Sequence, residues 1–258
     1  MMLMSSVVES MLLYAYESWI VKAHEGSIRK LADPTNIDVP ADYIGPRPSF
    51  PLTVKDLKDM LTAFKEKQII HAHYLVKILH EARNILQGYS NIRSANTSTS
   101  KQITVCGDLH GKLDDLLVIF YKNGLPSLDN PYVFNGDFVD RGPQSIEVFT
   151  VLLTSMILNP NEVFLNRGNH EDPVLNLRYG FIKEISKKYP RYSTVVFAMI
   201  QEVYSWLPLA TVVDKAVFIV HGGISDKIDL NILSALPRNK SILQSDYFHI
   251  YKLRVYVA

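Results

Sequence analysis

A single cysteine, Cys106, is present in the chain. One thiol cannot form an intramolecular disulfide or a zinc site built on several thiolates, so a disulfide framework and a cysteine zinc cluster are both excluded. Chains without disulfides suit a reducing compartment, and we expect a cytoplasmic protein, with the nucleus also open. Cys106 ends an apolar stretch, which predicts a buried strand residue.

The sequence also lacks a charge excess and a long uninterrupted apolar run. It has 27 Lys and Arg against 26 Asp and Glu, a net charge of +1. No strong field therefore favours nucleic acid or a membrane surface. The apolar stretch 1–21 is interrupted by Glu9 and Glu17 and has no basic leader, which argues against a signal peptide or a membrane span. We expect an amphipathic helix there instead.

What is present divides the chain into four parts. Residues 1–50 form a lead-in that ends in a Pro- and Gly-containing connector. A helical segment is predicted for residues 51–92 and an α/β core for residues 101–240, followed by a divergent tail, 241–258. The stretch 89–100 is rich in Ser, Asn and Thr, which predicts a linker.

The helical segment carries clear boundary signals. Thr53 is a predicted N-cap with Asp56 three residues on, a relative of the capping box. A second helix is predicted to stop at Gly88. Three histidines, His71, His73 and His80, are assigned to this second helix. No acidic or cysteine partner lies at helical spacing from them, so we expect hydrogen-bonded or exposed histidines and not metal ligands.

Beyond the linker, short apolar runs alternate with helical stretches. The predicted strands are 103–106, 132–134, 162–165 and 216–220. The predicted helices cover a face from Leu113 to Phe120, residues 143–158, and two stretches within 174–206 that are broken near Pro190. Strand–helix alternation indicates an α/β sheet with parallel crossovers.

Every predicted strand runs into a polar turn that contains glycine. The candidate functional residues of these turns are, in chain order, Asp108, His110, Asp137, Asp140, Arg141, Asn169, His170 and His221. Ligands of open α/β sheets bind beyond the carboxyl ends of the strands. One Gly-Asp turn is usually only a loop, but four such turns in this order favour a shared site.

Five of these residues are candidate metal ligands. Asp108 and His110 are two apart, so in an extended segment they point the same way and can share a cation. Asp137 can bridge two cations through its two oxygens, and Asn169 and His221 add an oxygen and a nitrogen. Mixed oxygen and imidazole donors suit manganese, iron or zinc better than calcium.

A two-metal site would support phosphate chemistry. Two cations roughly 3.5–4 Å apart would acidify a bridging water, orient a phosphate and offset its charge. His170 is placed to protonate a leaving alkoxide, Asp140 could hold that imidazole and keep it cationic, and Arg141 would clamp phosphate oxygens. The glycines would let the turns take positive φ and approach a tetrahedral anion closely.

The motifs GDLHG, GDFVDRG, RGNHE and HGG, in that order, resemble the signature of the phosphoprotein phosphatase family of serine/threonine phosphatases. The stretches FPLTVKDL, KLDDLLVIFYKNGLPS and NPYVFNGDFVDRG, together with the segment from LNRGNHED to NLRYGFIKEI, resemble its subgroup with C-terminal EF-hands, the retinal degeneration C type. Similarity covers about residues 40–240. The resemblance implies a metallophosphoesterase-type β-sandwich of mixed sheets flanked by helices.

The resemblance also implies roles and partners. The first metal would be held by Asp108, His110 and Asp137, the second by Asp137, Asn169 and His221, with His170 as the acid supported by Asp140 and with Arg141 on phosphate. Manganese is the usual cofactor, and iron or zinc also occur. The implied substrates are phosphoserine and phosphothreonine in proteins, and calmodulin or another regulatory protein is an implied partner of the subgroup.

After about Lys240 the resemblance is no longer recognisable. The family continues with another histidine ligand of the second metal and a further phosphate-binding arginine. An EF-hand pattern is also absent, so no calcium site is predicted. The tail alternates like a strand, and its His249 is either a substitute ligand or part of an unrelated terminal segment. We expect a fold that is incomplete at the C-terminus, with an open sheet edge.

Three functions stay open on these residues. The first is a metal-dependent serine/threonine protein phosphatase. The second is a truncated, catalytically impaired form that acts as a binding or regulatory protein. The third is another metallophosphoesterase, such as a dinucleoside polyphosphate hydrolase. The near-neutral charge disfavours a nucleic-acid substrate.

Overall fold

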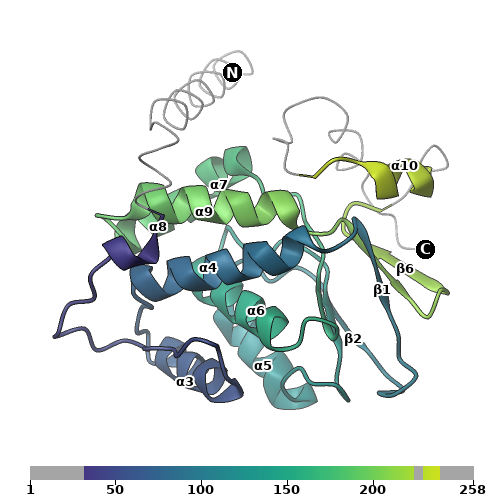
Figure 1. Ribbon diagram of the computed structural model, residues 1–258, viewed down its shortest axis with the longest axis horizontal. Helices are drawn as coiled ribbons and strands as arrows, with labels where there is room; N and C mark the ends of the chain where they lie inside the picture. The colour runs from purple at the N-terminus through teal and green to yellow at the C-terminus, as the bar shows by residue number, and fades with distance from the viewer. Residues whose placement is uncertain (1–31, 224–228, 239–258) are drawn as a thin grey trace, which may run out of the picture.

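The computed structural model describes residues 32–223 and 229–238 (Figure 1). The predicted N-terminal amphipathic helix and the tail with His249 lie outside the described residues. The described elements form two three-stranded sheets, with most of the helices gathered on one side (Figure 1). None of the helices in these two ranges is long and apolar enough to cross a membrane.

The predicted helical segment is present, after a short 3-10 turn, Pro34–Asn36, as α3, Val54–Lys65, and α4, Ala72–Gln87. Thr53 and Asp56 form the capping box at the start of α3, as predicted. His71 is the N-cap of α4 and therefore does not lie within the helix, a correction to the assignment above.

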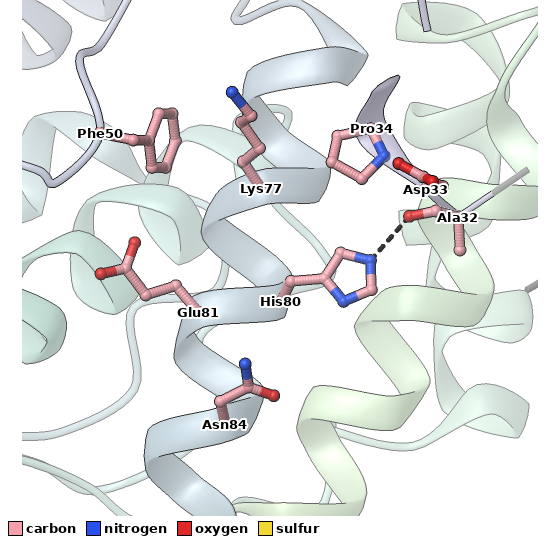
Figure 2. Close-up of a pocket in the computed structure, with 8 residues that line it drawn as sticks. All are labelled: Ala32, Asp33, Pro34, Phe50, Lys77, His80, Glu81 and Asn84. Atoms are coloured by element: carbon pink, nitrogen blue, oxygen red, sulfur yellow. Dashed lines mark hydrogen bonds between the residues drawn. The ribbon is translucent and has the colours of Figure 1, made fainter. Parts of the chain in front are cut away.

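The other two histidines of α4 bond to the main chain of the preceding segment. The Nδ1 of His73 lies 2.8 Å from the Pro34 carbonyl oxygen, and the Nε2 of His80 lies 2.6 Å from that of Ala32. These contacts confirm hydrogen-bonded histidines. Figure 2 shows His80 beside a hollow of about 560 Å³ next to α4, and no predicted site residue lines this hollow.

The parallel sheet carries the predicted strands β2, Thr104–Cys106, β3, Tyr132–Phe134, and β4, Val163–Leu165, in the order β2-β3-β4. Helix α5, Leu113–Asn123, follows β2, and α6, Ser145–Leu158, follows β3. Because all three strands are parallel, their carboxyl ends lie at the same edge. Cys106 is buried, as predicted.

The second sheet is mixed and has the order β1-β5-β6, with β1, Ile92–Ala95, parallel to β5, Ala210–Val213, and β6, Val217–Val220, antiparallel to β5. Strand β1 corrects the linker predicted for 89–100. Its sequence, IRSA, is too short and too polar to show a strand period, and it is ordered by pairing with a distant strand.

Alternate residues of β3 face opposite sides of the parallel sheet. Val133 packs in a small core between the two sheets, together with Phe164 and Val213. Tyr132 and Phe134 face the main core, to which the helices contribute. This arrangement is the predicted β-sandwich flanked by helices, with one parallel sheet and one mixed sheet.

The stretch predicted as two helices contains three: α7, Pro173–Tyr179, α8, Phe181–Lys188, and α9, Ser193–Trp206. Gly180, with φ of 109°, separates the first two, because this left-handed conformation suits glycine. Helices α4 and α9 lie side by side (Figure 1). Helix α6 is buried around most of its circumference, which places it at the centre of the helical layer.

Strand β6 is an edge of the mixed sheet. Within residues 32–223 and 229–238, no strand pairs with its outer side, and Val217 is 55% exposed. The short helix α10, Leu230–Ala235, ends near β1, where the Asn91 side chain donates to the Leu236 carbonyl oxygen at 2.6 Å.

Candidate metal centre

The loops that follow the three parallel strands meet at one edge of the sheet, and they do so through close backbone contacts. A Cβ added to Gly168 would lie 2.3 Å from the Asp137 amide nitrogen, and one added to Gly136 would lie 2.5 Å from the Gly168 Cα. Only glycine allows this approach. The loops that follow β3 and β4 are therefore in close backbone contact at Asp137.

Several site residues themselves adopt left-handed backbone conformations. The φ values are 43° at His110, 54° at Asp137, 70° at Asp140 and 66° at Arg141. The expected positive φ at motif glycines occurs at some of them, such as Gly136, but much of the turning is done by these functional residues. Such conformations persist only where the surrounding structure enforces them.

Asp108, His110 and Asp137 come together as predicted, although by a different local geometry. His110 is in a turn, not in an extended segment, yet its Nε2 lies 3.6 Å from Asp108 Oδ2 and 3.7 Å from Asp137 Oδ2. Its Nδ1 donates to the Val139 carbonyl oxygen at 3.0 Å. Nε2 is therefore left as the acceptor nitrogen, and it is buried with no hydrogen-bond partner among the described residues.

His221 is arranged in the same way on the other side of Asp137. Its Nδ1 lies 2.7 Å from the Asn135 carbonyl oxygen, which fixes Nδ1 as the donor and turns Nε2 inward. Nε2 lies 3.3 Å from Asp137 Oδ1 and 2.9 Å from Asn169 Oδ1. The two Asp137 oxygens thus face two different histidines, as expected of a carboxylate that bridges two cations.

These residues fit divalent metal ions. Two groups each offer ligand atoms within 4.8 Å of one another, namely Asp108, Asp137 and His221, and His110, Asp137 and His170. Because His110 Nε2 is buried and has no hydrogen-bond partner among the described residues, its lone pair is available to coordinate a metal ion. Imidazole nitrogens anchored through Nδ1 on carbonyl oxygens are the arrangement that metal-binding histidines adopt.

Charges in this cluster stabilise one another. The imidazole of His110, whose Nε2 lies 3.6 Å from Asp108 Oδ2, lowers the pKa of Asp108 more than burial raises it. Burial on its own would lower the pKa of His110, but the nearby Asp108 carboxylate, the hydrogen bond to the Val139 carbonyl oxygen and the charge of Asp137 raise it. The site is thus an acidic cluster that favours positive charge at its centre.

His170 and Asp140 form a buried pair beside the candidate metal ligands. His170 Nδ1 lies 2.9 Å from Asp140 Oδ2, and Asp140 has no exposed surface. Arg141 donates to His170 Nε2 at 3.2 Å, so in this arrangement the imidazole carries its proton on Nδ1. The His170 ring packs against that of His110, with centroids 4.7 Å apart.

Glu171 lies inside the RGNHE motif, but sequence reasoning gave it no role. It is fully buried, and its carboxylate accepts the backbone N–H groups of Asp137 at 2.8 Å, Phe138 at 2.9 Å and Gly168 at 2.8 Å. Burial and the charge of Asp137 raise the pKa of Glu171 to about 7, against the effect of these three donors. Glu171 thus holds the backbone of Asp137 and of its neighbour Phe138 in place.

Asn176, on α7, was also missed. It is fully buried and donates to Asp140 Oδ2 at 2.9 Å and to the His170 carbonyl oxygen at 2.7 Å. It opens the stretch NLRYGFIKEI, which resembles the subgroup, but it lies outside the four strand-end motifs, and its contact with Asp140 exists only in the folded chain.

The fold and this cluster define a metallophosphoesterase. The chain belongs to the calcineurin-like phosphoesterase family, which matches residues 101–254. A second match, to the PPP5 TPR repeat region, covers residues 7–93. The chain is 55% identical over 204 residues to serine/threonine-protein phosphatase with EF-hands 1 of Rattus norvegicus. This alignment covers 79% of this chain and 32% of the rat protein.

Two further relatives support this assignment. Serine/threonine-protein phosphatase rdgC of Drosophila melanogaster is 49% identical over 203 residues, covering 78% of this chain and 31% of that protein. A solved protein serine/threonine phosphatase of Saccharomyces cerevisiae, described as similar to human phosphatase PP5, superposes with a TM-score of 0.71 and 30% identity, over 77% of this chain and 64% of that one. The predicted resemblance and the fold class are confirmed. The chain spans about a third of the length of the curated relatives it matches.

Proposed function

We propose that the protein is a metal-dependent serine/threonine protein phosphatase. The observation that carries the proposal is the pair of inward-facing histidine nitrogens, from His110 and His221, on either side of the Asp137 carboxylate. The His170–Asp140 pair and Arg141 lie beside them. The names of the relatives, which are serine/threonine phosphatases, support the same activity.

Asp108, His110 and Asp137 would hold one divalent cation, and Asp137, Asn169 and His221 the other. We propose manganese, with iron or zinc as alternatives, because these metals accept mixed oxygen and imidazole ligands. When bound, the cations supply Lewis acidity that activates water for attack on phosphorus and offsets charge on the phosphate.

The chain's own residues then bind the phosphate and move a proton. The guanidinium of Arg141 can leave His170 and take two phosphate oxygens through its planar fork. Its departure frees His170 Nε2 to carry the proton that the leaving serine or threonine oxygen requires. Asp140 keeps the other ring nitrogen, Nδ1, in the donor state and stabilises the imidazolium.

The test is release of phosphate from a phosphoserine peptide by the purified chain with and without manganese. We expect His170→Asn to lower kcat by about 10²–10⁴, the range of general-acid catalysis. Glu202→Gln, a change at an exposed residue of α9, serves as the control and should retain the wild-type rate. A folded wild-type chain that binds metal and releases no phosphate would contradict the proposal.

Substrates and partners extend this proposal. Phosphoproteins are the proposed substrates, and calmodulin or another regulatory protein is a proposed partner. The match of residues 7–93 to a TPR repeat region supports a regulator that contacts this part of the chain. We also propose a cytoplasmic location, with the nucleus as the alternative, since a single buried cysteine suits a reducing compartment.

A second candidate is a catalytically impaired form that binds phosphoproteins without turnover. It is favoured by the set proposed for the second cation, Asp137, Asn169 and His221, which has a single histidine among residues 32–223 and 229–238. Counting metal by elemental analysis separates the two candidates. Two metals per chain support the phosphatase, and one or none supports the impaired form.

A further inference from the structure

Asn176 spans the two partners of the buried acid–base pair. Its Nδ2 donates one proton to Asp140 Oδ2 at 2.9 Å and the other to the His170 main-chain carbonyl oxygen at 2.7 Å. The same planar group therefore contacts the carboxylate that holds the imidazole and the backbone that carries it. Asn176 has no exposed surface, so water does not compete for these bonds.

The orientation of the Asn176 amide follows from its neighbours. Both groups next to Nδ2, the Asp140 carboxylate oxygen and the His170 carbonyl oxygen, are acceptors only, so the NH₂ side must face them. On the opposite side, Gln201 Nε2 of α9 lies 3.4 Å from Asn176 Oδ1. The amide cannot turn over without placing oxygen against two oxygens.

The remaining contacts of Asp140 leave little other restraint on its carboxylate. Oδ1 accepts the Phe181 backbone N–H at 3.0 Å, and Oδ2 is shared by Asn176 and His170 Nδ1. Without the Asn176 donor, the contacts left among the described residues are one hydrogen bond to Oδ1 and one between Oδ2 and the imidazole. The imidazole alone then holds Oδ2, so the carboxylate and the ring can turn together. A rotated carboxylate would release the imidazole from its alignment, because the Nδ1–H bond is directional.

We propose that Asn176 is a positioning residue that fixes the Asp140 carboxylate and thereby the tautomer and direction of His170. This inference rests on the proposed function only for its kinetic consequence. Asparagine is suited to the position because its two donors diverge from one rigid plane. Leucine has the same branched heavy-atom skeleton without donors, and aspartate would set a second carboxylate against Asp140.

The structural test needs no turnover. The full chain is labelled with ¹⁵N-histidine, and the His170 Nδ1–H resonance is assigned by its loss in His170→Asn. In Asn176→Leu, we expect exchange of this proton with water to rise at least about tenfold, as for a weakened buried hydrogen bond. Thr211→Val is the matched control, since it removes one buried hydrogen bond, to Asn166, without contact with the pair.

The signals of His110 and His221 should keep their positions in Asn176→Leu, which distinguishes a local effect from general loosening. Unchanged exchange of the His170 proton in Asn176→Leu overturns the proposal. So does an equal rise in Thr211→Val, because the effect would then follow from lost stability and not from lost positioning.

The kinetic test uses two aryl phosphates that differ in the basicity of the leaving group. Protonation matters most for the more basic phenolate. In Asn176→Leu we expect kcat for phenyl phosphate to fall about tenfold or more, and kcat for p-nitrophenyl phosphate to fall less than about threefold, with KM unchanged for both. Equal losses for the two substrates overturn the proposal. A wild-type chain without turnover would contradict the proposed function instead, and the exchange measurement would still decide the role of Asn176.

Discussion

Replacing Glu171 with glutamine should weaken both the fold and the metal site. The Glu171 carboxylate is the acceptor for three backbone N–H groups, those of Asp137, Phe138 and Gly168. Glutamine has the same size, but it keeps one acceptor oxygen and turns an NH₂ group toward a donor. At least one and up to two of the three N–H groups then lose their acceptor in a buried environment.

The expected cost follows from two opposing effects. A buried donor without a partner costs about 1–3 kcal/mol, so one or two such donors give about 1–6 kcal/mol. Burial of the charged carboxylate is unfavourable and contributes to the raised pKa of Glu171. The neutral glutamine removes this unfavourable contribution, which offsets part of the loss. We expect the free energy of unfolding of Glu171→Gln to fall by about 2–4 kcal/mol.

Metal affinity should fall as well, because the backbone that Glu171 holds carries Asp137, the residue proposed to bridge the two cations. Changes behind metal ligands typically cost about 10–100-fold in affinity. Urea unfolding measures the first effect, and calorimetric titration with Mn²⁺ measures the second. Glu202→Gln, at an exposed position, is the control for the chemical change. If Glu171→Gln unfolds within about 0.5 kcal/mol of the wild type and binds Mn²⁺ equally well, the reasoning is wrong.

Three further outcomes are expected. Gly168→Ala would place a Cβ 2.4 Å from Asp137 Oδ1 and should lower Mn²⁺ affinity more than about tenfold. In the control Gly88→Ala, the added Cβ lies 3.4 Å from the nearest heavy atom, so calorimetric titration with Mn²⁺ should give the wild-type affinity. Burial raises the pKa of Asp56, but its hydrogen bonds outweigh this effect and lower the pKa to about 2. In urea unfolding at pH 7, Asp56→Asn should therefore lower the free energy of unfolding by about 2 kcal/mol. This difference from the wild type should shrink as the pH falls below about 4. A pH-independent difference would contradict this. Burial raises the pKa of the Cys106 thiol to about 11, so at pH 8 a thiol reagent should react no faster than the chain unfolds. Rapid reaction of the folded protein would contradict a buried position for Cys106.

The strands and helices that carry a strong hydrophobic pattern could be predicted from the sequence, and β1 and β5 could not. β3 and β4 are apolar and buried throughout, which marks them without reference to the rest of the chain. β1 is a short, partly polar segment that becomes a strand by pairing with β5, far along the sequence. A strand that forms only by pairing with a distant segment has no recognisable pattern in its own residues.

The candidate metal ligands were predictable because each directly follows a strand whose end could be recognised. Their local geometry was not, since His110 reaches Asp108 through a left-handed turn and not through an extended segment. Supporting residues were harder still. Asn176 acts through a contact that exists only after α7 has packed against the loop carrying Asp140.

The residues proposed for the second cation come from the ends of strands in both sheets, since Asp137 and Asn169 follow β3 and β4 of the parallel sheet and His221 follows β6 of the mixed sheet. The residues proposed for the first cation are complete once the loops after β2 and β3 have met. Occupancy of the second position should therefore be a gauge of completed folding: a chain whose last described strand has not joined the sheet would lack His221 at this position and bind the second cation weakly. Metal content could be used to rank preparations by the fraction of molecules that have reached the native state.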